Sequence, residues 1–399
     1  MKRLLVLGGT RGLIPIVKTA QQLGCYVITC DYLPDNIAHK YSDAYCYADL
    51  SDKEAVLEAA KALHIDGVLT FATDYPLLPL AYVAETLGLP AVGSYESVSI
   101  LQNKGKFRRF LAEHGFQVPT AKSYQSIAPA LKDVELFHWP VIVKPTDSSG
   151  SRGVRKVEHP EDLKSSIEYA LSFSRSYEFI IEDYIPQKGY ASDSDCFSVD
   201  GKLEFVSFNS QRFDQKAENP HAPVAYSWPS SMPMEKQESL RSELQRLITL
   251  LGLKSSIYNI ETREGIDGNV YIMECSPRGG GNKIAECVER ATGVKLLENT
   301  VRAAVGMPIE NMEFKGYNGF WTQFAIHSYQ TGRFREVWID EAVKKYLVDL
   351  TLWVAPGDEV RAYTSVQWVV GLALFHFDSK AEWEAVSESI SDYVKVLLD

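Results

Sequence analysis

The residues best suited to chemistry lie in Val270–Gly281, where an alternating apolar strand pattern runs into a carboxylate, an arginine and a glycine turn. Side chains two apart on a strand share a face, so Glu274 and Ser276 can point at one centre. An earlier apolar run also ends in a carboxylate, Glu261, and a turn signal separates the two runs. A hairpin would place Glu261 beside Glu274. Such a pair suits magnesium bound together with substrate phosphates, and a surface hairpin with two solvated acids is the alternative.

A second group of residues could bind phosphate. The strand-like segment Trp139–Pro145 is apolar except for Lys144, and a loop of small residues, Asp147–Gly153, follows it. A lysine in a buried strand requires an anionic partner, and the N–H groups of such a loop can bind phosphate oxygens. The loop lacks the G-K-[ST] ending of a P-loop, so a plain hairpin loop is an equal alternative.

A third group could bind a substrate in the N-terminal region. The turn Gly8–Gly12 follows the first strand pattern, and Asp74 follows a later one. Ligands of doubly wound sheets lie at the carboxyl ends of the strands, where the turn at Gly9 and Thr10 could bind a carboxylate and Asp74 an ammonium. Alternatively, the glycines only permit a tight turn and Asp74 caps the helix that starts near Pro76. The turn reads G-G-x-x-G and not G-x-G-x-x-G, which disfavours a dinucleotide-binding dehydrogenase.

The elements that must position these groups begin with a strand–helix alternation that predicts a doubly wound α/β domain. We expect strands at 4–7, 26–30, 44–47, 67–71 and 91–93, with helices at 13–23, 53–63 and 77–87. A helical stretch at 94–115 follows, and it carries Asn103 and Lys104. Further on we expect a helix at 160–172, a strand at 179–186, a hairpin at 196–199 and 203–208, and helices at 235–251, 282–291 and 296–305.

Two regions differ in character from this pattern. The stretch 211–234 is polar, contains His221 and Trp228, and predicts a long loop that acts as a substrate lid. From about residue 320 the pattern predicts a small α+β unit, with strands at 320–326 and 366–377 and a final helix at 380–398.

Composition limits the function classes. The chain has 399 residues with 45% hydrophobic content, which is enough for two or three domains with cores. A net charge of −11 and a pI near 5.3 disfavour a nucleic-acid or anionic-membrane partner. Neither a signal peptide nor a membrane span is indicated. Six cysteines without C-x-x-C spacing and eight histidines without a cluster favour reduced cysteines, a cytoplasmic location and no zinc site.

Taken together, the motifs resemble the ATP-grasp superfamily from Met1 to about Gly306. The motifs in family order are Asn103-Lys104, P-V-I-V-K-P with Lys144, the loop at 147–153, I-I-E-D-Y-I at 180–185, N-I-E at 259–261 and M-E-C-S-P-R at 273–278. The resemblance implies an α/β ATP-grasp fold with a Rossmann-like N-terminal domain and a C-terminal α+β cap. The implied domains are 1–95 (Rossmann-like), 96–186 (linker helix and small lobe), 187–310 (large lobe with the metal site) and 311–399 (cap).

Within this superfamily, the motifs most resemble those of carboxylate–amine ligases. These include amino-acid ligases, biotin carboxylase, purine-pathway members and the carbamoyl-phosphate synthase large chain. This resemblance implies an ADP-forming ligase that makes an amide or peptide bond through an acyl phosphate, acting on an amino acid. The implied cofactors are ATP and Mg²⁺, with Mn²⁺ as a substitute, and the implied partners are small carboxylates and amines, with a homodimer allowed. The alternatives are a purine-pathway or carbamoyl-phosphate-type ligase and a non-catalytic nucleotide-binding module.

The resemblance also assigns roles to residues. Nucleotide binding falls to Lys104, Lys144, Ser148, Ser149, Gly150, Ser151, Gly153, Glu182, Asp183, Tyr184, Ile185 and Asp195. The resemblance assigns metal binding to Glu261, Glu274 and Ser276, and catalysis to Arg278 and Lys144. Together with the sheet-edge argument, the expected substrate residues are Gly9, Thr10, Asp74, Arg278 and Gly280. The sequence departs from the family in two places. Ser276 stands where the family has Asn, and no acid for the ribose occurs at Gly189-Tyr190, so Asp193 or Asp195 would have to replace it.

Overall fold

The computed structural model describes residues 1–220 and 222–399, and its N-terminal unit is a parallel sheet with the strand order β3-β2-β1-β4. The strands are β1 (Arg3–Leu7), β2 (Tyr26–Asp31), β3 (Ala44–Tyr47) and β4 (Gly67–Leu69), and the helices are α1 (Ile14–Gln22), α2 (Lys53–Leu63) and α3 (Leu77–Leu87). Helix α2 begins where the Asp52 carboxylate accepts hydrogen bonds from two N–H groups of the first turn. The predicted parallel strand–helix alternation is therefore confirmed.

The predicted short strand at 91–93 is wrong, because this segment packs against the large lobe and does not join the parallel sheet. The Val92 carbonyl accepts a hydrogen bond from the Lys254 N–H at 2.8 Å, and Gly93 packs closely against Leu253. The segment therefore connects the N-terminal unit to the rest of the chain.

The small lobe follows a break in the predicted helix at 94–115. The chain forms α4 (Tyr95–Gln102) and α5 (Lys104–Glu113), because Asn103 is extended and its side chain caps α5 by accepting from the Lys106 N–H. The lobe has an antiparallel sheet in the order β5-β8-β6-β7. Its elements are β5 (Ala121–Tyr124), α6 (Ile127–Lys132), β6 (Val141–Pro145), β7 (Arg155–Val157), α7 (Leu163–Leu171) and β8 (Phe179–Asp183).

The large lobe contains an antiparallel sheet in the order β10-β9-β13-β14. The elements are β9 (Ser192–Val199), β10 (Lys202–Val206), α8 (Met234–Leu250), β13 (Ser256–Glu264), β14 (Val270–Ser276), α9 (Ile284–Thr292) and α10 (Leu296–Ala304). One face of the sheet packs on α8 through buried leucines, including Leu240, Leu244 and Leu247. The predicted hairpin is confirmed, and its register places Glu261 directly opposite Glu274.

The C-terminal unit has a five-stranded sheet, β11-β12-β15-β19-β17, and a three-stranded sheet, β18-β16-β20. Its elements are β11 (Ser210–Phe213), β12 (Pro223–Trp228), β15 (Phe320–Ile326), β16 (Gly332–Ile339), α11 (Glu341–Lys344), β17 (Leu347–Leu352), β18 (Glu359–Val360), β19 (Gly371–Phe377), α12 (Lys380–Glu388), α13 (Ile390–Tyr393) and β20 (Val394–Leu398). Short 3₁₀ turns occur at Arg11–Leu13, Ile37–Lys40, Val134–Leu136, Pro160–Asp162 and Val366–Trp368.

Two predictions for this region are corrected. The stretch 211–234 is not one long loop, because β11 and β12 pair with each other and β12 pairs with β15. His221, which belonged to that prediction, lies outside the described residues. The final helix ends early, because Val394–Leu398 carries apolar and β-branched residues that pair with β16 as strand β20.

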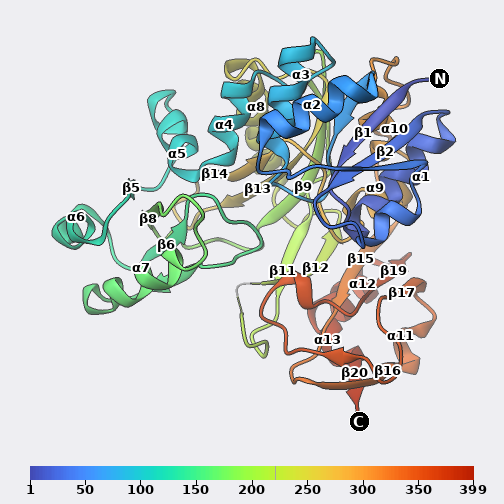
Figure 1. Cartoon of the computed structure of the whole chain (residues 1–399). Helices are drawn as coiled ribbons and strands as arrows, with labels where there is room; N and C mark the ends of the chain where they lie inside the picture. The colour runs from blue at the N-terminus through green and yellow to red at the C-terminus, as the bar shows by residue number, and fades with distance from the viewer. Residues whose placement is uncertain (221) are drawn as a thin grey trace.

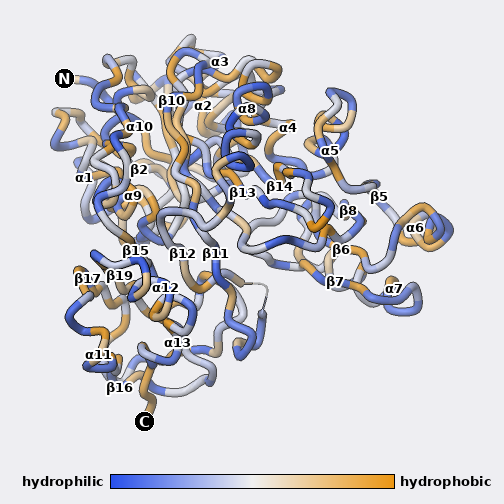
Figure 2. The backbone as a smooth tube through the Cα atoms, turned by 180° about the vertical axis from the view of Figure 1, so that it is seen from behind, coloured by the Kyte–Doolittle hydropathy of each residue, from blue (hydrophilic) through white to orange (hydrophobic). Residues whose placement is uncertain are grey.

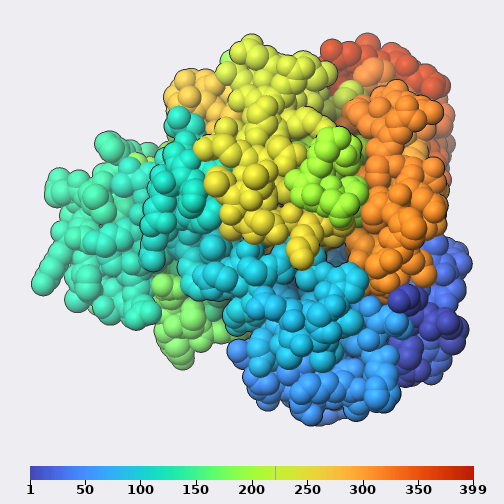
Figure 3. All heavy atoms as spheres, turned by 90° about the horizontal axis from the view of Figure 1, so that it is seen from above, coloured from blue at the N-terminus to red at the C-terminus, as the bar shows by residue number. Residues whose placement is uncertain are grey.

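The four parts surround a common centre (Figure 1). The small lobe projects to one side and the C-terminal unit lies below the large lobe, and the view from behind shows the same arrangement (Figure 2). Seen from above, the small lobe extends away from both the N-terminal and the C-terminal units (Figure 3). Among the described residues no helix is long and apolar enough to cross a membrane.

Candidate active site

A cavity of about 1300 Å³ lies where the four parts meet. Its walls include the loop at 148–152, the end of β8, the β13–β14 hairpin, the N-terminal glycine turn and the C-terminal segments 351–353 and 366–369. Most of the predicted site residues therefore line one cavity, although they come from distant parts of the chain.

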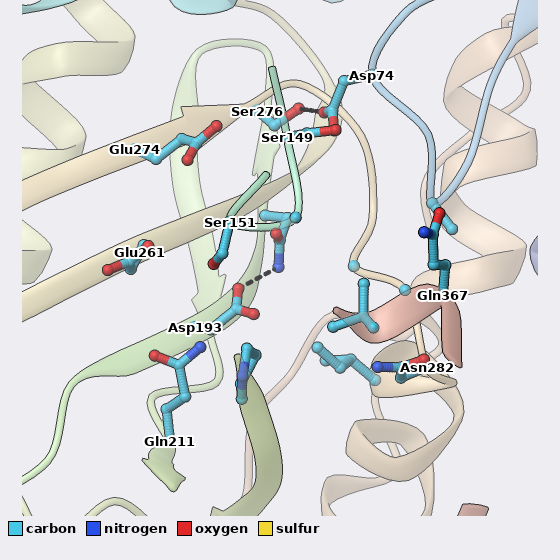
Figure 4. Close-up of a pocket in the computed structure, with 18 of the residues that line it drawn as sticks. Asp74, Ser149, Ser151, Asp193, Gln211, Glu261, Glu274, Ser276, Asn282 and Gln367 are labelled. Carbon is cyan, nitrogen blue, oxygen red and sulfur yellow. Dashed lines mark hydrogen bonds between the residues drawn. The ribbon is translucent and has the colours of Figure 1, made fainter. Parts of the chain in front are cut away.

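The acidic hairpin forms one wall of this cavity. Glu261 and Glu274 lie opposite each other on neighbouring strands, and both line the cavity (Figure 4). The Lys104 ammonium lies 3.5 Å from Glu274, and the Arg263 guanidinium donates to Glu261 at 2.7 Å. No group of three or more metal-ligating side chains occurs among the described residues. Two carboxylates nevertheless fit magnesium, which binds through one or two protein carboxylates plus phosphate oxygens and water.

The Ser276 hydroxyl forms its hydrogen bond away from the Glu261–Glu274 pair. Its hydroxyl donates to the Asp74 carboxylate at 2.6 Å, and its partner across the sheet is Asn259 (Figure 4). The Ser276 hydroxyl thus links β14 to the N-terminal unit, and its metal role stays a prediction.

Arg278 is held by the same carboxylate. Its Nε and Nη2 atoms donate to the two Asp74 oxygens at 2.8 and 3.0 Å, and its Nη1 donates to the Asn259 side chain at 3.0 Å. Burial opposes the charge on Asp74, but the Arg278 guanidinium keeps the pKa of this carboxyl below its usual range. Such a bidentate pair fixes the orientation of the guanidinium within the cavity wall.

Of the two sequence interpretations of Asp74, the helix cap is wrong, and the binding of an ammonium stays a prediction. Helix α3 begins at its N-cap, Pro76, without a side-chain cap, so Asp74 does not cap it. The Asp74 carboxylate accepts two hydrogen bonds from Arg278 and one from Ser276, so its charge is paired and most of its acceptor sites are filled. Asp74 is a positioning residue for Arg278.

Lys144 belongs to a buried ionic group. Its ammonium pairs with one Glu182 oxygen, and Arg108 Nε donates to the other at 2.9 Å. Glu182 is only 2% exposed, and although burial opposes its charge, Arg108 and Lys144 lower its pKa to about 2. Each Glu182 oxygen accepts from one cation, and the contact of this side chain with adenine stays a prediction.

The end of β8 keeps one donor available for a base. The N–H groups of Asp183 and Tyr184 donate to the carbonyls of Thr120 and Pro140, at 2.9 and 3.0 Å. The N–H of Ile185 has no hydrogen-bond partner among the residues that the structure describes, and Ile185 lines the cavity. Of the predicted adenine contacts, the Ile185 backbone is the best placed.

The small-residue loop is anchored at its N-terminal end. The Asp147 carboxylate accepts from the N–H groups of Arg175 and Ser176, and Lys104 donates to the Ser148 carbonyl at 2.7 Å. Ser148, Ser149, Gly150 and Ser151 line the cavity. Gly153 instead packs against the Pro145 ring with φ near +74°, so it serves the turn geometry and not a ligand.

Of four further predicted residues, two line the cavity and two lie outside it. Thr10 and Gly280 line the cavity, but Gly9 is enclosed by Asn36 and His39 within the N-terminal unit. Asp195 is fully buried and accepts from the Gly280 N–H at 2.8 Å, and burial raises its pKa to about 7. Asp195 therefore supports the glycine turn beneath the cavity, and its predicted ribose role has no support.

Several residues that face or support the site were not assigned from the sequence. Arg108 holds Glu182, Asn259 joins Arg278 to Asp193, and Gln211 and Tyr226 line the cavity. The N-I-E motif already contained Asn259. The others carried no spacing signal, because each becomes a neighbour only through tertiary pairing.

The comparisons with known proteins agree with this architecture. Residues 137–286 match the family described as ATP-grasp domain. The chain contains an ATP-grasp domain. The L-amino acid ligase from Bacillus licheniformis superposes with a TM-score of 0.82 at 20% identity, covering 100% of this chain and 99% of that one. The biotin carboxylase domain of 2-oxoglutarate carboxylase from Hydrogenobacter thermophilus, a dimer with MgADP and bicarbonate, gives a TM-score of 0.72 at 16% identity, covering 99% and 90%.

Among curated proteins, the carbamoyl phosphate synthase large chain of Pseudothermotoga lettingae is 24% identical over 316 residues, which is 78% of this chain and 28% of that protein. The chain thus spans about a quarter of the length of such relatives. At these identities the solved structures establish the ATP-grasp fold, and they leave the substrates open.

Proposed function

We propose that this protein is an ATP-dependent ligase that joins a carboxylate to an amine through an acyl phosphate, with an amino acid as a substrate. The observation that carries the proposal is the convergence of two lysines, two carboxylates and a fixed arginine on one cavity, namely Lys104, Lys144, Glu261, Glu274 and Arg278. The L-amino acid ligase from Bacillus licheniformis shares the fold along the whole chain, and we take an amino acid as the substrate to test first.

The geometry of the cavity fits a nucleoside triphosphate. The Ile185 N–H would face the base, and the backbone of the loop at 148–151 would meet the phosphates. Lys104 and Lys144, from α5 and β6, would neutralise the phosphates from two sides. Glu261 and Glu274 would hold Mg²⁺ or Mn²⁺, which when bound supplies positive charge to the phosphate oxygens.

The reaction has two steps. A substrate carboxylate oxygen forms a bond to the γ-phosphorus, the bond from this phosphorus to the bridging oxygen breaks, and ADP leaves. The amine, in its neutral form, then forms a bond to the acyl carbon. The bond from this carbon to the phosphate oxygen breaks, phosphate leaves with the electron pair, and the nitrogen releases one proton. Arg278, held by Asp74 and Asn259, would stabilise the negative charge of the transferred group because its position is fixed before the reaction.

The cavity walls would also protect an acyl phosphate from water. The C-terminal segments 351–353 and 366–369 and the β11–β12 region contribute to the same cavity as the loop at 148–152. We propose that movement of the loop at 147–153 completes the enclosure, because reactive intermediates require exclusion of water.

The experiment is a screen of ADP and phosphate release against pooled amino acids in the presence of ATP and Mg²⁺. We expect release that needs a carboxylate and increases with an amine, together with a product of the summed mass minus water. ADP release with bicarbonate and without an amine would instead favour a carbamoyl-phosphate-type or purine-pathway ligase. No turnover with any acid or amine would favour a nucleotide-binding module.

A further inference from the structure

Beside the proposed metal pair lies a polar patch that the proposed chemistry has not used. It consists of Asp193, Gln211 and Tyr226, all of which line the cavity. Asp193 lies on β9 directly across from Glu261, and Gln211 on β11 pairs with Tyr226 on β12. Figure 4 shows the Gln211 amide next to Asp193.

The patch is rich in hydrogen-bond acceptors. Gln211 is 5% exposed, yet its side-chain carbonyl has no hydrogen-bond partner among the described residues. One Asp193 oxygen accepts from the Asn259 amide at 2.7 Å, and the buried Tyr226 phenol lies within hydrogen-bonding reach of Asp193 and Gln211. A carboxylate has about four acceptor sites, so Asp193 can accept further donors from the cavity. A buried, unpaired carbonyl is costly unless a ligand donates to it.

We infer that Asp193 and Gln211 form the subsite for the amino group of the amine substrate, an assignment that rests on the proposed ligase function. An ammonium provides three donors and a positive charge, which suit one carboxylate and one orphan carbonyl. A carboxylate or phosphate group would be repelled by Asp193 and would leave the Gln211 carbonyl unpaired.

The position of the patch suits the second step of the reaction. Asp193 is one strand from Glu261, and its charge also acts on Arg278. An amino group at Asp193 therefore lies next to the residues that would hold the acyl phosphate. This subsite replaces Asp74, whose carboxylate is engaged by Arg278.

The test separates the two half-reactions. Hydroxylamine is a small amine, mainly uncharged at neutral pH, that converts acyl phosphates to hydroxamates and does not require an ammonium subsite. Hydroxamate formation and amide formation are measured in the wild type, in Asp193→Asn and in Gln211→Leu, with the amino acids that react in the pooled screen. Asp200→Asn, in the exposed turn between β9 and β10, is the matched control, and thermal melting checks the fold.

We expect Asp193→Asn to raise the KM for the amine amino acid by about 10- to 100-fold, because a charged hydrogen bond is lost. Hydroxamate formation and the KM for ATP should stay within about twofold of wild type, and Gln211→Leu should show a smaller effect of the same kind. Unchanged amine KM in both variants would overturn the inference, and so would a raised KM for ATP with lost hydroxamate formation, which would place Asp193 in the nucleotide site. A wild type that forms neither product would refute the ligase function itself, and the subsite with it.

Discussion

Glu182 should stabilise the small lobe through its charge, and Glu182→Gln measures the contribution. Its carboxylate lies between Lys144 and Arg108 in a site with 2% exposure, where its pKa falls from 4.5 to about 2. Because each tenfold change in proton affinity corresponds to about 1.4 kcal/mol, the charged form contributes about 3 kcal/mol at neutral pH. This agrees with the roughly 3–5 kcal/mol lost when one partner of a buried ion pair is removed.

The effect should depend on pH in a defined direction. The folded pKa of Glu182 lies below its unfolded value, so the contribution is complete above pH 4.5 and is lost as the pH falls toward about 2. The difference in the free energy of unfolding between wild type and Glu182→Gln should therefore be smaller by about 1.4 kcal/mol at about pH 3.5 than at pH 7.

The assay is urea unfolding of both proteins at pH 7, 5 and 3.5, followed by circular dichroism, with Glu161→Gln on the exposed surface of the same lobe as a control. The control should change the free energy of unfolding by less than about 0.5 kcal/mol. A Glu182→Gln difference below about 1 kcal/mol at pH 7, or one that does not vary with pH, would refute the reasoning.

Three further predictions concern the proposed site. Lys144→Ala should abolish ATP binding at millimolar concentration in a folded protein, as measured by calorimetry, and unchanged affinity would exclude Lys144 from the phosphate site. Glu274→Gln should leave nucleotide binding measurable but lower turnover at least about a hundredfold, and near wild-type turnover with magnesium would show that the hairpin is not the metal site. Asp74→Asn should lower kcat with little change in the KM of the amine, because it loosens Arg278; a raised amine KM alone would restore the ammonium role of Asp74.

The parts of the fold with local signals could be predicted from the sequence. The parallel N-terminal sheet follows from apolar strands that alternate with amphipathic helices, and the turn between two apolar runs fixed the pairing of Glu261 with Glu274. Strand β20 was predicted as helix because its short apolar segment directly follows the helical segments α12 and α13. Such a segment fits a helix or a strand, and its pairing with β16 makes it a strand.

Site residues that belong to a sequence motif could be predicted. Contacts between segments far apart in the sequence could not. Lys104, Lys144 and the loop at 148–151 do line the cavity, as expected. The pairing of Asp74 with Arg278 was missed because the two residues are 204 positions apart, and the Asp193–Gln211 patch depends on β11 joining the C-terminal sheet. Contacts of this kind leave no periodicity or spacing in the chain.

The most direct test of the central claim follows oxygen atoms. Once the carboxylate substrate is identified, its carboxyl group is labelled with ¹⁸O and the phosphate released during turnover is examined by mass spectrometry. An acyl phosphate retains one carboxylate oxygen on phosphorus, so we expect one ¹⁸O atom in each phosphate when both carboxylate oxygens are labelled. Phosphate without ¹⁸O, released at the same rate as the amide product, would contradict the proposed reaction.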